Sequence, residues 1–186
     1  MSELKDRINQ IKLVFKLKDV KFKSDFDMFH HLCENNYHEL IKELIDNGFD
    51  ANIKDKYGYT ALMYVSENNN IESVKLLLAN GVDVNIQNEY GTTALIHVSY
   101  FNDIKLVKLL LANGADINIK DNGGYTALMR ATYYGNIEVV KLLLANGADV
   151  NIKDEYGDTA LMFANKYNNI EAVNVLKEHG AKWWVN

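Results

Sequence analysis

Apolar residues recur along the chain at helical spacing, and polar runs separate the apolar segments. In one copy of the pattern, a short apolar segment follows Thr60 and ends near Glu67. A longer segment follows Asn70, and its apolar face is formed by Ile71, Val74, Leu77 and Leu78. Residues three and four apart lie on the same side of a helix. The pattern therefore predicts a short helix followed by a longer helix that buries one face.

The same pattern returns every 33 residues. The blocks YGYTALMY, YGTTALIH, GGYTALMR and YGDTALMF begin at Tyr57, Tyr90, Gly123 and Tyr156. The blocks that end the longer helix keep the same step, with ANGVDVNIQ, ANGADINIK and ANGADVNIK beginning at Ala79, Ala112 and Ala145. Less regular copies flank them, with DNGFDANIK from Asp46 and EHGAKWWVN from Glu178. A fixed period of this length indicates an architecture of stacked repeats.

Each copy also carries residues that begin and end helices. A threonine, which can accept a hydrogen bond from a free helix amide, precedes each short helix at Thr60, Thr93, Thr126 and Thr159. A second capping residue precedes each longer helix, at Asn70, Asp103, Asn136 and Asn169. The longer helices end at Asn-Gly, with glycine suited to the left-handed position. We expect the Asp and Asn residues that follow, such as Asp83 and Asn85, to stabilise turns by bonding to nearby backbone.

These blocks resemble the ankyrin repeat, whose pattern is written D-x-x-G-x-T-P-L-H-x-A-A, then V-x-x-L-L, then G-A-D-V-N. The resemblance covers about residues 22–186 and implies an all-α solenoid of stacked helix-turn-helix pairs joined by hairpin-like loops. The boundaries predicted from it are 1–21 for an N-terminal capping segment, 22–54 for a degenerate first repeat, 55–87, 88–120 and 121–153 for repeats 2 to 4, and 154–186 for a C-terminal capping repeat 5.

Two positions depart from the ankyrin pattern in every regular copy. Alanine stands in place of the motif proline at Ala61, Ala94, Ala127 and Ala160. The motif histidine is replaced by Met63, Ile96, Met129 and Met162, which puts its hydrogen bonds between repeats in doubt. His30 occupies the histidine position of the first copy.

The two ends differ from the inner copies as capping elements do, because outer repeats must turn a face to water. Residues 1–21 are expected to include a helix whose apolar face is formed by Leu4, Ile8, Ile11 and Phe15. Glu43 and Lys177 stand where inner copies have leucine. We expect Trp183 and Trp184 to cover the last core; alternatively they form an exposed anchor for a partner or a second copy of the chain.

Composition narrows the possible functions. The chain has 186 residues, a formal charge of −5 and no apolar run near the ~18 residues that span a bilayer, so neither nucleic acid nor membrane is an expected partner. Lys12, Lys16, Lys18, Lys21 and Lys23 cluster locally, and we interpret them as a solvated face, with an anion-binding patch as the alternative. The single cysteine favours an intracellular protein, cytoplasmic or delivered into a host cell.

Catalytic signatures are missing from the sequence. It contains no GxxxxGK[ST], HExxH, paired CxxC or GxSxG motif, so we expect no enzyme activity and no cofactor. His30, His31 and Cys33 form the one cluster that needs weighing as a metal site. A structural zinc site needs four converging ligands, and His31 is expected to point elsewhere, so we expect no metal. Cys33 falls at a small packing position, which favours a buried, inert thiol.

Tyrosine is concentrated where the copies differ from one another. In ankyrin-type proteins such positions lie mainly at the hairpin tips and at the inner, concave end of the first helix. Nine of the eleven tyrosines occupy them here, and tyrosine offers a large rigid contact area with a hydrogen-bonding tip. The predicted partner-binding residues are Tyr57, Tyr59, Tyr90, Tyr100, Phe101, Tyr125, Tyr133, Tyr134, Tyr156 and Tyr167.

We therefore predict a non-catalytic protein-recognition module that uses the concave face and the hairpin tips. The strongest candidates for partner binding are Tyr100, Phe101, Tyr133 and Tyr134, because the tip tyrosines can instead pack on neighbouring tips. Coding bias toward A+T-rich codons is the competing explanation for all of them. Acidic residues border the surface, so a partner with basic character is expected. A monomer is expected, and the alternative is a structural or self-associating protein that uses the tryptophan pair and the aromatic surface.

Overall fold

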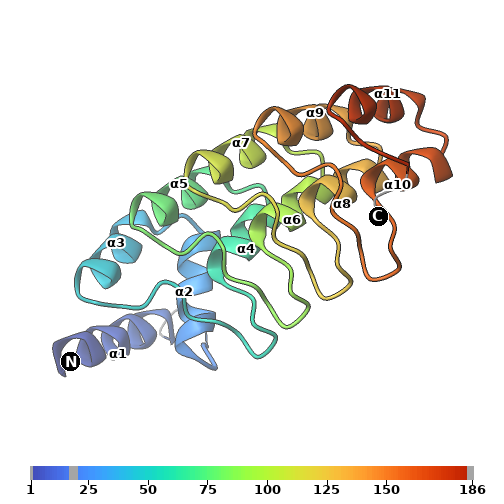
Figure 1. Ribbon diagram of the computed structural model, residues 1–186. Helices are drawn as coiled ribbons and strands as arrows, with labels where there is room; N and C mark the ends of the chain where they lie inside the picture. The colour runs from blue at the N-terminus through green and yellow to red at the C-terminus, as the bar shows by residue number, and fades with distance from the viewer. Residues whose placement is uncertain (1, 17–20, 184–186) are drawn as a thin grey trace. The chain divides into compact units, whose positions relative to one another are not determined.

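The computed structural model describes residues 2–16 and 21–183, and the helices in these residues are all α-helices (Figure 1). They are α1 (Ser2–Lys16), α2 (Asp25–Glu34), α3 (His38–Asp46), α4 (Ala61–Glu67), α5 (Ile71–Ala79), α6 (Ala94–Tyr100), α7 (Ile104–Ala112), α8 (Ala127–Tyr133), α9 (Ile137–Ala145), α10 (Ala160–Lys166) and α11 (Ile170–Glu178). The same residues form no strand beyond an isolated bridge between Lys54 and Thr60. The predicted all-α class is confirmed.

The chain divides into two compact units, Met1–Asp83 and Val84–Asn186. In the first unit, α2 packs on α4, α3 packs on α5, and α1 contacts α3. In the second unit, α6, α8 and α10 form one row and α7, α9 and α11 form another, with a long loop before each short helix (Figure 1). From α4 onward, each helix of seven residues is followed by one of nine, as the repeat pattern predicts, whereas α2 and α3 have ten and nine residues.

The predicted helix caps are present, with one exception. Each threonine Oγ1 accepts a hydrogen bond from the amide three residues later, at Thr60, Thr93, Thr126 and Thr159. Asn70, Asp103 and Asn169 cap the longer helices in the same way. Asn136 makes no such bond. Its side-chain amide instead donates to the carbonyls of Ser99 and Tyr100, both at 2.9 Å, and so links two neighbouring repeats.

The loops between copies are held by a second set of polar side chains. Asn52, Asn85, Asn118 and Asn151 accept a hydrogen bond through Oδ1 from the backbone amide 31 residues later, at 2.7 to 3.1 Å. Asp116 and Asp149 accept from the amide two residues later, which confirms the predicted turns. The asparagines reach the next copy rather than their own turn, so they join successive repeats.

Each hairpin is organised around one side chain, at Asp55, Asn88, Asp121 and Asp154, which we call the hairpin residues. Their Oδ1 atoms accept hydrogen bonds from the amides two and four residues later, at 2.8 to 3.0 Å. Successive hairpins pack closely within the second unit. A Cβ at Gly124, where φ is +79°, would lie 2.7 Å from Asp154 Cα, so glycine is needed there.

The N-terminal helix caps the first unit as expected. Ile8, Ile11 and Phe15 are buried, and Leu4 is half-buried. Arg7 Nε lies 2.7 Å from Glu43 Oε1 in an ion pair, which explains why Glu43 replaces a leucine at this end of the unit. Residues 17–20 of the predicted cap lie outside the described residues.

The C-terminal aromatic pair is described only in part. Trp183 is 40% exposed, and Lys177 Nζ lies 5.4 Å from its ring centroid. Trp184 lies outside the described residues.

Candidate functional site

Five of the predicted binding residues form one surface in the second unit. We call Tyr100, Phe101, Tyr133, Tyr134 and Tyr167 the aromatic strip. Tyr100 and Tyr133 are the last residues of α6 and α8, while Phe101, Tyr134 and Tyr167 are the residues that cap α6, α8 and α10. Three consecutive repeats thus contribute rings at the same place in each copy.

The rings of the aromatic strip contact one another in sequence. Phe101 and Tyr100 have centroids 4.7 Å apart, and Tyr100 lies 4.0 Å from Tyr134. Tyr134 lies 4.8 Å from Tyr133, which lies 4.8 Å from Tyr167. These spacings fall near the range in which aromatic pairs attract each other. The strip is therefore one continuous row of rings rather than five separate side chains.

The aromatic strip remains exposed because the helix core ends before it. Ala131 and Thr132 are buried, whereas Tyr133 and Tyr134 are 37% and 42% exposed. Gly135 then turns the chain out of the helix with φ of +72°. Adjacent helical residues point about 100° apart, yet both rings reach solvent because the helix ends there. Tyr100, Phe101 and Tyr167 are 42% to 50% exposed.

Hydrogen bonds between hydroxyl groups accompany the ring contacts. Burial raises the pKa of Tyr134, and a hydrogen bond with Tyr100 raises it further. A hydrogen bond with Tyr133 is the main reason that the pKa of Tyr167 is raised. The raised pKa values therefore reflect how close these tyrosines of neighbouring repeats lie to one another.

The other predicted binding residues lie on the hairpins. Tyr57, Tyr90 and Tyr156 are exposed, at 45%, 58% and 84%, and neither Tyr90 nor Tyr156 has a ring contact with another described residue. Tyr59 and Tyr125 are half-buried. Tyr59 lies 5.3 Å from Tyr64, and Tyr125 packs under Arg130 and beside Phe163. The structure therefore places the Tyr59 ring against its own repeat and the Tyr125 ring between Arg130 of its own repeat and Phe163 of the next.

Two of the hairpin residues also contact a side chain through Oδ2, and the sequence analysis missed these contacts. Tyr64 donates its hydroxyl to Asp55 Oδ2 at 2.9 Å, and Arg130 Nη2 lies 2.5 Å from Asp121 Oδ2. Each partner stands nine residues after its carboxylate. The signal available in the sequence was this spacing, together with the rarity of arginine, which occurs twice in the chain.

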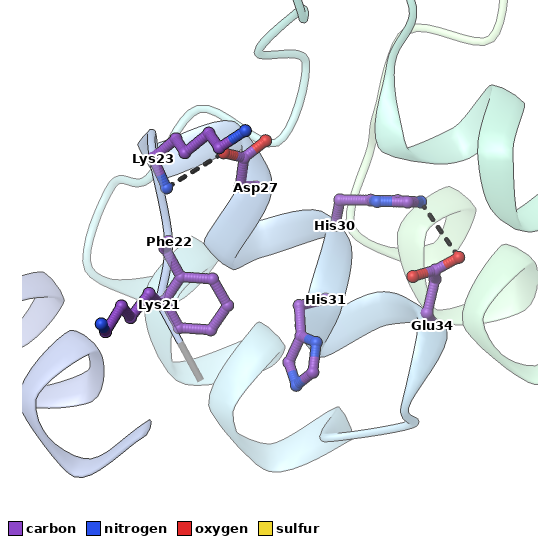
Figure 2. Close-up of a pocket in the computed structure, with 7 residues that line it drawn as sticks. All are labelled: Lys21, Phe22, Lys23, Asp27, His30, His31 and Glu34. Atoms are coloured by element: carbon purple, nitrogen blue, oxygen red, sulfur yellow. Dashed lines mark hydrogen bonds and ion pairs between the residues drawn. The ribbon is translucent and has the colours of Figure 1, made fainter. Parts of the chain in front are cut away.

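A surface pocket of about 340 Å³ lies in the first unit beside α2, and Figure 2 shows the residues that line it. His30 Nε2 lies 3.5 Å from Glu34 Oε1, and the His30 ring packs on Phe26 and Tyr64. The His31 ring packs on other residues, Phe15, Phe22 and Tyr37. The two imidazoles therefore diverge, as expected.

His30, His31 and Cys33, for which no metal was expected, lie in the part of the chain that the structure describes. No group of three or more His, Cys, Asp or Glu side chains is placed there to hold an ion. Cys33 is buried, as predicted, and burial raises the pKa of its thiol to about 12. A thiol with that pKa is a poor nucleophile near neutral pH.

The basic N-terminal segment is partly neutralised in the structure. Lys12 forms an ion pair with Asp25, and the Lys23 amide donates to Asp27 Oδ2. Lys18 lies outside the described residues. Within the described residues, no helix has the length and apolar character needed to cross a membrane.

Comparison with known proteins agrees with the repeat architecture. A family model described as ankyrin repeats, in three copies, matches residues 7–88, 29–121, 62–154 and 95–186. A search of curated proteins found no match. The family matches overlap and together extend from residue 7 to residue 186, and they agree in register with the helix pairs. The chain belongs to the ankyrin-repeat family.

Proposed function

We propose that this chain is a non-catalytic recognition module that binds a protein partner through the aromatic strip and the neighbouring hairpin tips. Ankyrin repeats are generally protein–protein interaction modules. The observation that carries the choice of surface is the continuous row of exposed rings at the ends of α6, α8 and α10.

The aromatic strip suits binding because its rings are already ordered. Contacts between neighbouring rings restrict their rotamers before a partner binds. Less side-chain entropy is then lost on association, and each ring still offers apolar area with a polar tip. Affinity should be concentrated in the central rings, Tyr100, Tyr133 and Tyr134, since hot spots cluster at the centre of an interface.

A triple variant, Tyr100→Ala with Tyr133→Ala and Tyr134→Ala, tests this surface. Wild-type and variant proteins are immobilised and exposed to lysate of the source organism, and proteins retained by the wild type are identified and titrated individually. We expect the variant to lose capture of the same partner by at least tenfold in affinity. Its helical circular dichroism should remain that of the wild type, because these rings lie outside the core.

The matched control changes three exposed side chains of the longer helices in the same unit, Lys105→Ala, Lys108→Ala and Ile170→Ala. Capture that is equal for all three proteins would contradict the proposed surface. Light scattering over a concentration series separates partner binding from self-association. A dimer that the triple variant abolishes would assign the strip to contact between copies of the chain instead.

A further inference from the structure

In each hairpin residue, one side-chain atom bonds to the hairpin backbone and the other is left for a different contact. Oδ1 holds the hairpin in every copy, whereas the Oδ2 atoms of Asp55 and Asp121 contact the residue nine positions later. That residue is Tyr64, His97, Arg130 or Phe163 in successive copies. Tyr64 and Arg130 can donate a hydrogen bond to the carboxylate, but the phenyl ring of Phe163 cannot.

Asp154 is consequently left with a buried oxygen that nothing satisfies. The residue is 6% exposed, and its Oδ2 has no hydrogen-bond partner among the described residues. Asp154, Glu155 and Asp158 also form no ion pair with any described residue. A buried carboxylate oxygen without a donor costs free energy, on the order of 1–3 kcal/mol or more for a charged group. Such a group is retained only where something offsets that cost.

The preceding repeat shows which group fits this position. Arg130 reaches Asp121 Oδ2 at 2.5 Å, and its guanidinium carbon lies 4.2 Å from the centroid of the Tyr125 ring. The arginine side chain stays 32% exposed, so this carboxylate is reached from the surface. Tyr125 also lies 5.6 Å from Phe163, and the charge of Asp154 helps to raise the pKa of Tyr125. Tyr125 therefore borders both Arg130 and Phe163, which stand at the same position in two successive repeats.

We propose that Asp154 binds the guanidinium group of an arginine side chain that the protein partner supplies. The incoming arginine takes the place that Arg130 has in the preceding repeat. Arginine fits better than lysine, because its planar head pairs with a carboxylate through two hydrogen bonds and stacks on aromatic faces. This inference rests on the proposed function, since it names one feature of the partner that the recognition surface accepts.

Entry of the arginine requires the Phe163 side chain to change rotamer, because Phe163 holds the position of Arg130 and is 4% exposed. Phe163 lies 6.0 Å from Tyr133, a central ring of the aromatic strip. Displacement of Phe163 by the arginine therefore acts on the strip itself. The arginine site and the aromatic strip form one continuous binding surface in the second unit.

Carbon-detected NMR of the full chain tests the site with a defined probe. The side-chain carboxyl resonances of Asp154 and Asp121 are followed while N-acetyl-arginine amide is added. We expect a saturable shift for Asp154 and none for Asp121, whose oxygen is already occupied by Arg130. N-acetyl-citrulline amide, which has the same shape without the charge, should leave both resonances in place. N-acetyl-lysine amide should bind at least fivefold more weakly than the arginine probe.

Phe163→Arg provides the matched variant, because it restores the internal pair found in the preceding repeat. This variant should be at least as stable as the wild type and should lose the Asp154 response to the probe. Equal shifts for arginine and citrulline, equal shifts for Asp154 and Asp121, or a response that persists in Phe163→Arg would each overturn the proposal.

Asp154→Asn relates the site to partner binding. Asparagine holds the same hairpin at Asn88, so the variant should fold. We expect its affinity for the captured partner to fall at least tenfold. If the aromatic triple variant loses capture while Asp154 ignores the probe, the recognition surface stands and the arginine site is wrong. If Asp154 binds the probe while the triple variant still captures the partner, the aromatic surface is wrong and the arginine site stands.

Discussion

Both units are rich in aromatic contacts, but the rings at the centre of these contacts differ in how far they are exposed to solvent. In the first unit, Phe15 of α1 lies 5.3 to 5.5 Å from Phe22, His31 and Tyr37, and it is 4% exposed. In the second unit, the rings of the aromatic strip are at comparable distances but are 37% to 50% exposed. The central ring of the first cluster and the rings of the aromatic strip thus have similar contacts but differ in burial.

The difference has an energetic basis. Removing a buried ring leaves a cavity and loses its transfer free energy, while removing an exposed ring leaves neither. The cluster around Phe15 fastens the capping helix to the first unit. The residues of the aromatic strip remain 37% to 50% exposed. The following substitutions test this contrast, from the largest expected effect to the smallest.

Phe15→Ala should give the largest loss of stability. The buried ring is the centre of the first cluster, and truncations of this type cost about 3–5 kcal/mol. We expect urea unfolding to shift by that free energy and amide exchange to accelerate most in α1. Tyr134→Ala is the comparison in the second unit. A loss of stability from Tyr134→Ala as large as that from Phe15→Ala would break the contrast.

Tyr64→Phe should give an intermediate effect. The change removes only the hydroxyl that donates to Asp55 Oδ2 at 2.9 Å, and bonds to charged groups contribute about 1.5–3 kcal/mol. Thermal unfolding measures the loss, with Tyr90→Phe at an exposed tip as the control. If Asp55→Asn, which keeps the hairpin bonds, makes Tyr64→Phe harmless, the bond itself is responsible for the loss.

The interaction free energy between two rings of the aromatic strip should be smaller than the effect of Tyr64→Phe. A double-mutant cycle of Tyr100→Ala and Tyr134→Ala, whose ring centroids lie 4.0 Å apart, should give about 0.5–1.5 kcal/mol of interaction. The free energy of unfolding of the four proteins provides the value. Additive losses would show that the rings are adjacent without stabilising each other, and the argument for a pre-ordered surface would fail.

The smallest expected effect is the contribution of His30 to the pH dependence of the free energy of unfolding. Burial lowers the pKa of His30 below 6.5, and this outweighs the opposing charges of Glu34, Asp27 and Asp55. Because the unfolded chain then binds the proton more readily, the contribution of His30 is full above pH 6.5 and is lost as pH falls through the folded pKa. Urea unfolding at a series of pH values should show this slope, and His30→Gln should reduce it. An unchanged slope in that variant would assign the effect to other groups.

The sequence was sufficient for features that depend on local geometry repeated in every copy. The threonine caps, the helix bounds near Ala61–Glu67 and the buried faces all follow from spacing and capping chemistry. The boundaries of the individual repeats stay a prediction. Asn136 shows the limit of such inference, because its amide is drawn to carbonyls of a neighbouring repeat that lies about one period away in the chain.

The candidate surface could be predicted only as a set of positions. Variation among copies selected Tyr100, Tyr133 and Tyr134, but their mutual contacts depend on how successive repeats stack. The same limit hid the unsatisfied oxygen of Asp154, because it arises from a missing partner nine residues away. Tyr59 and Tyr125 were placed among the binding residues, yet both are half-buried against other side chains of the protein, which variability alone does not reveal.

The separate contacts of the two oxygens in the aspartate hairpin residues have a consequence for how such a chain can evolve. Because one oxygen secures the loop, a duplicated copy inherits a hairpin that already folds. A single later substitution nine residues downstream then decides whether the other oxygen is bonded by tyrosine, by arginine or by none of the described residues. New ligand preferences can therefore arise by one codon change in one copy, without a compensating change elsewhere in the fold.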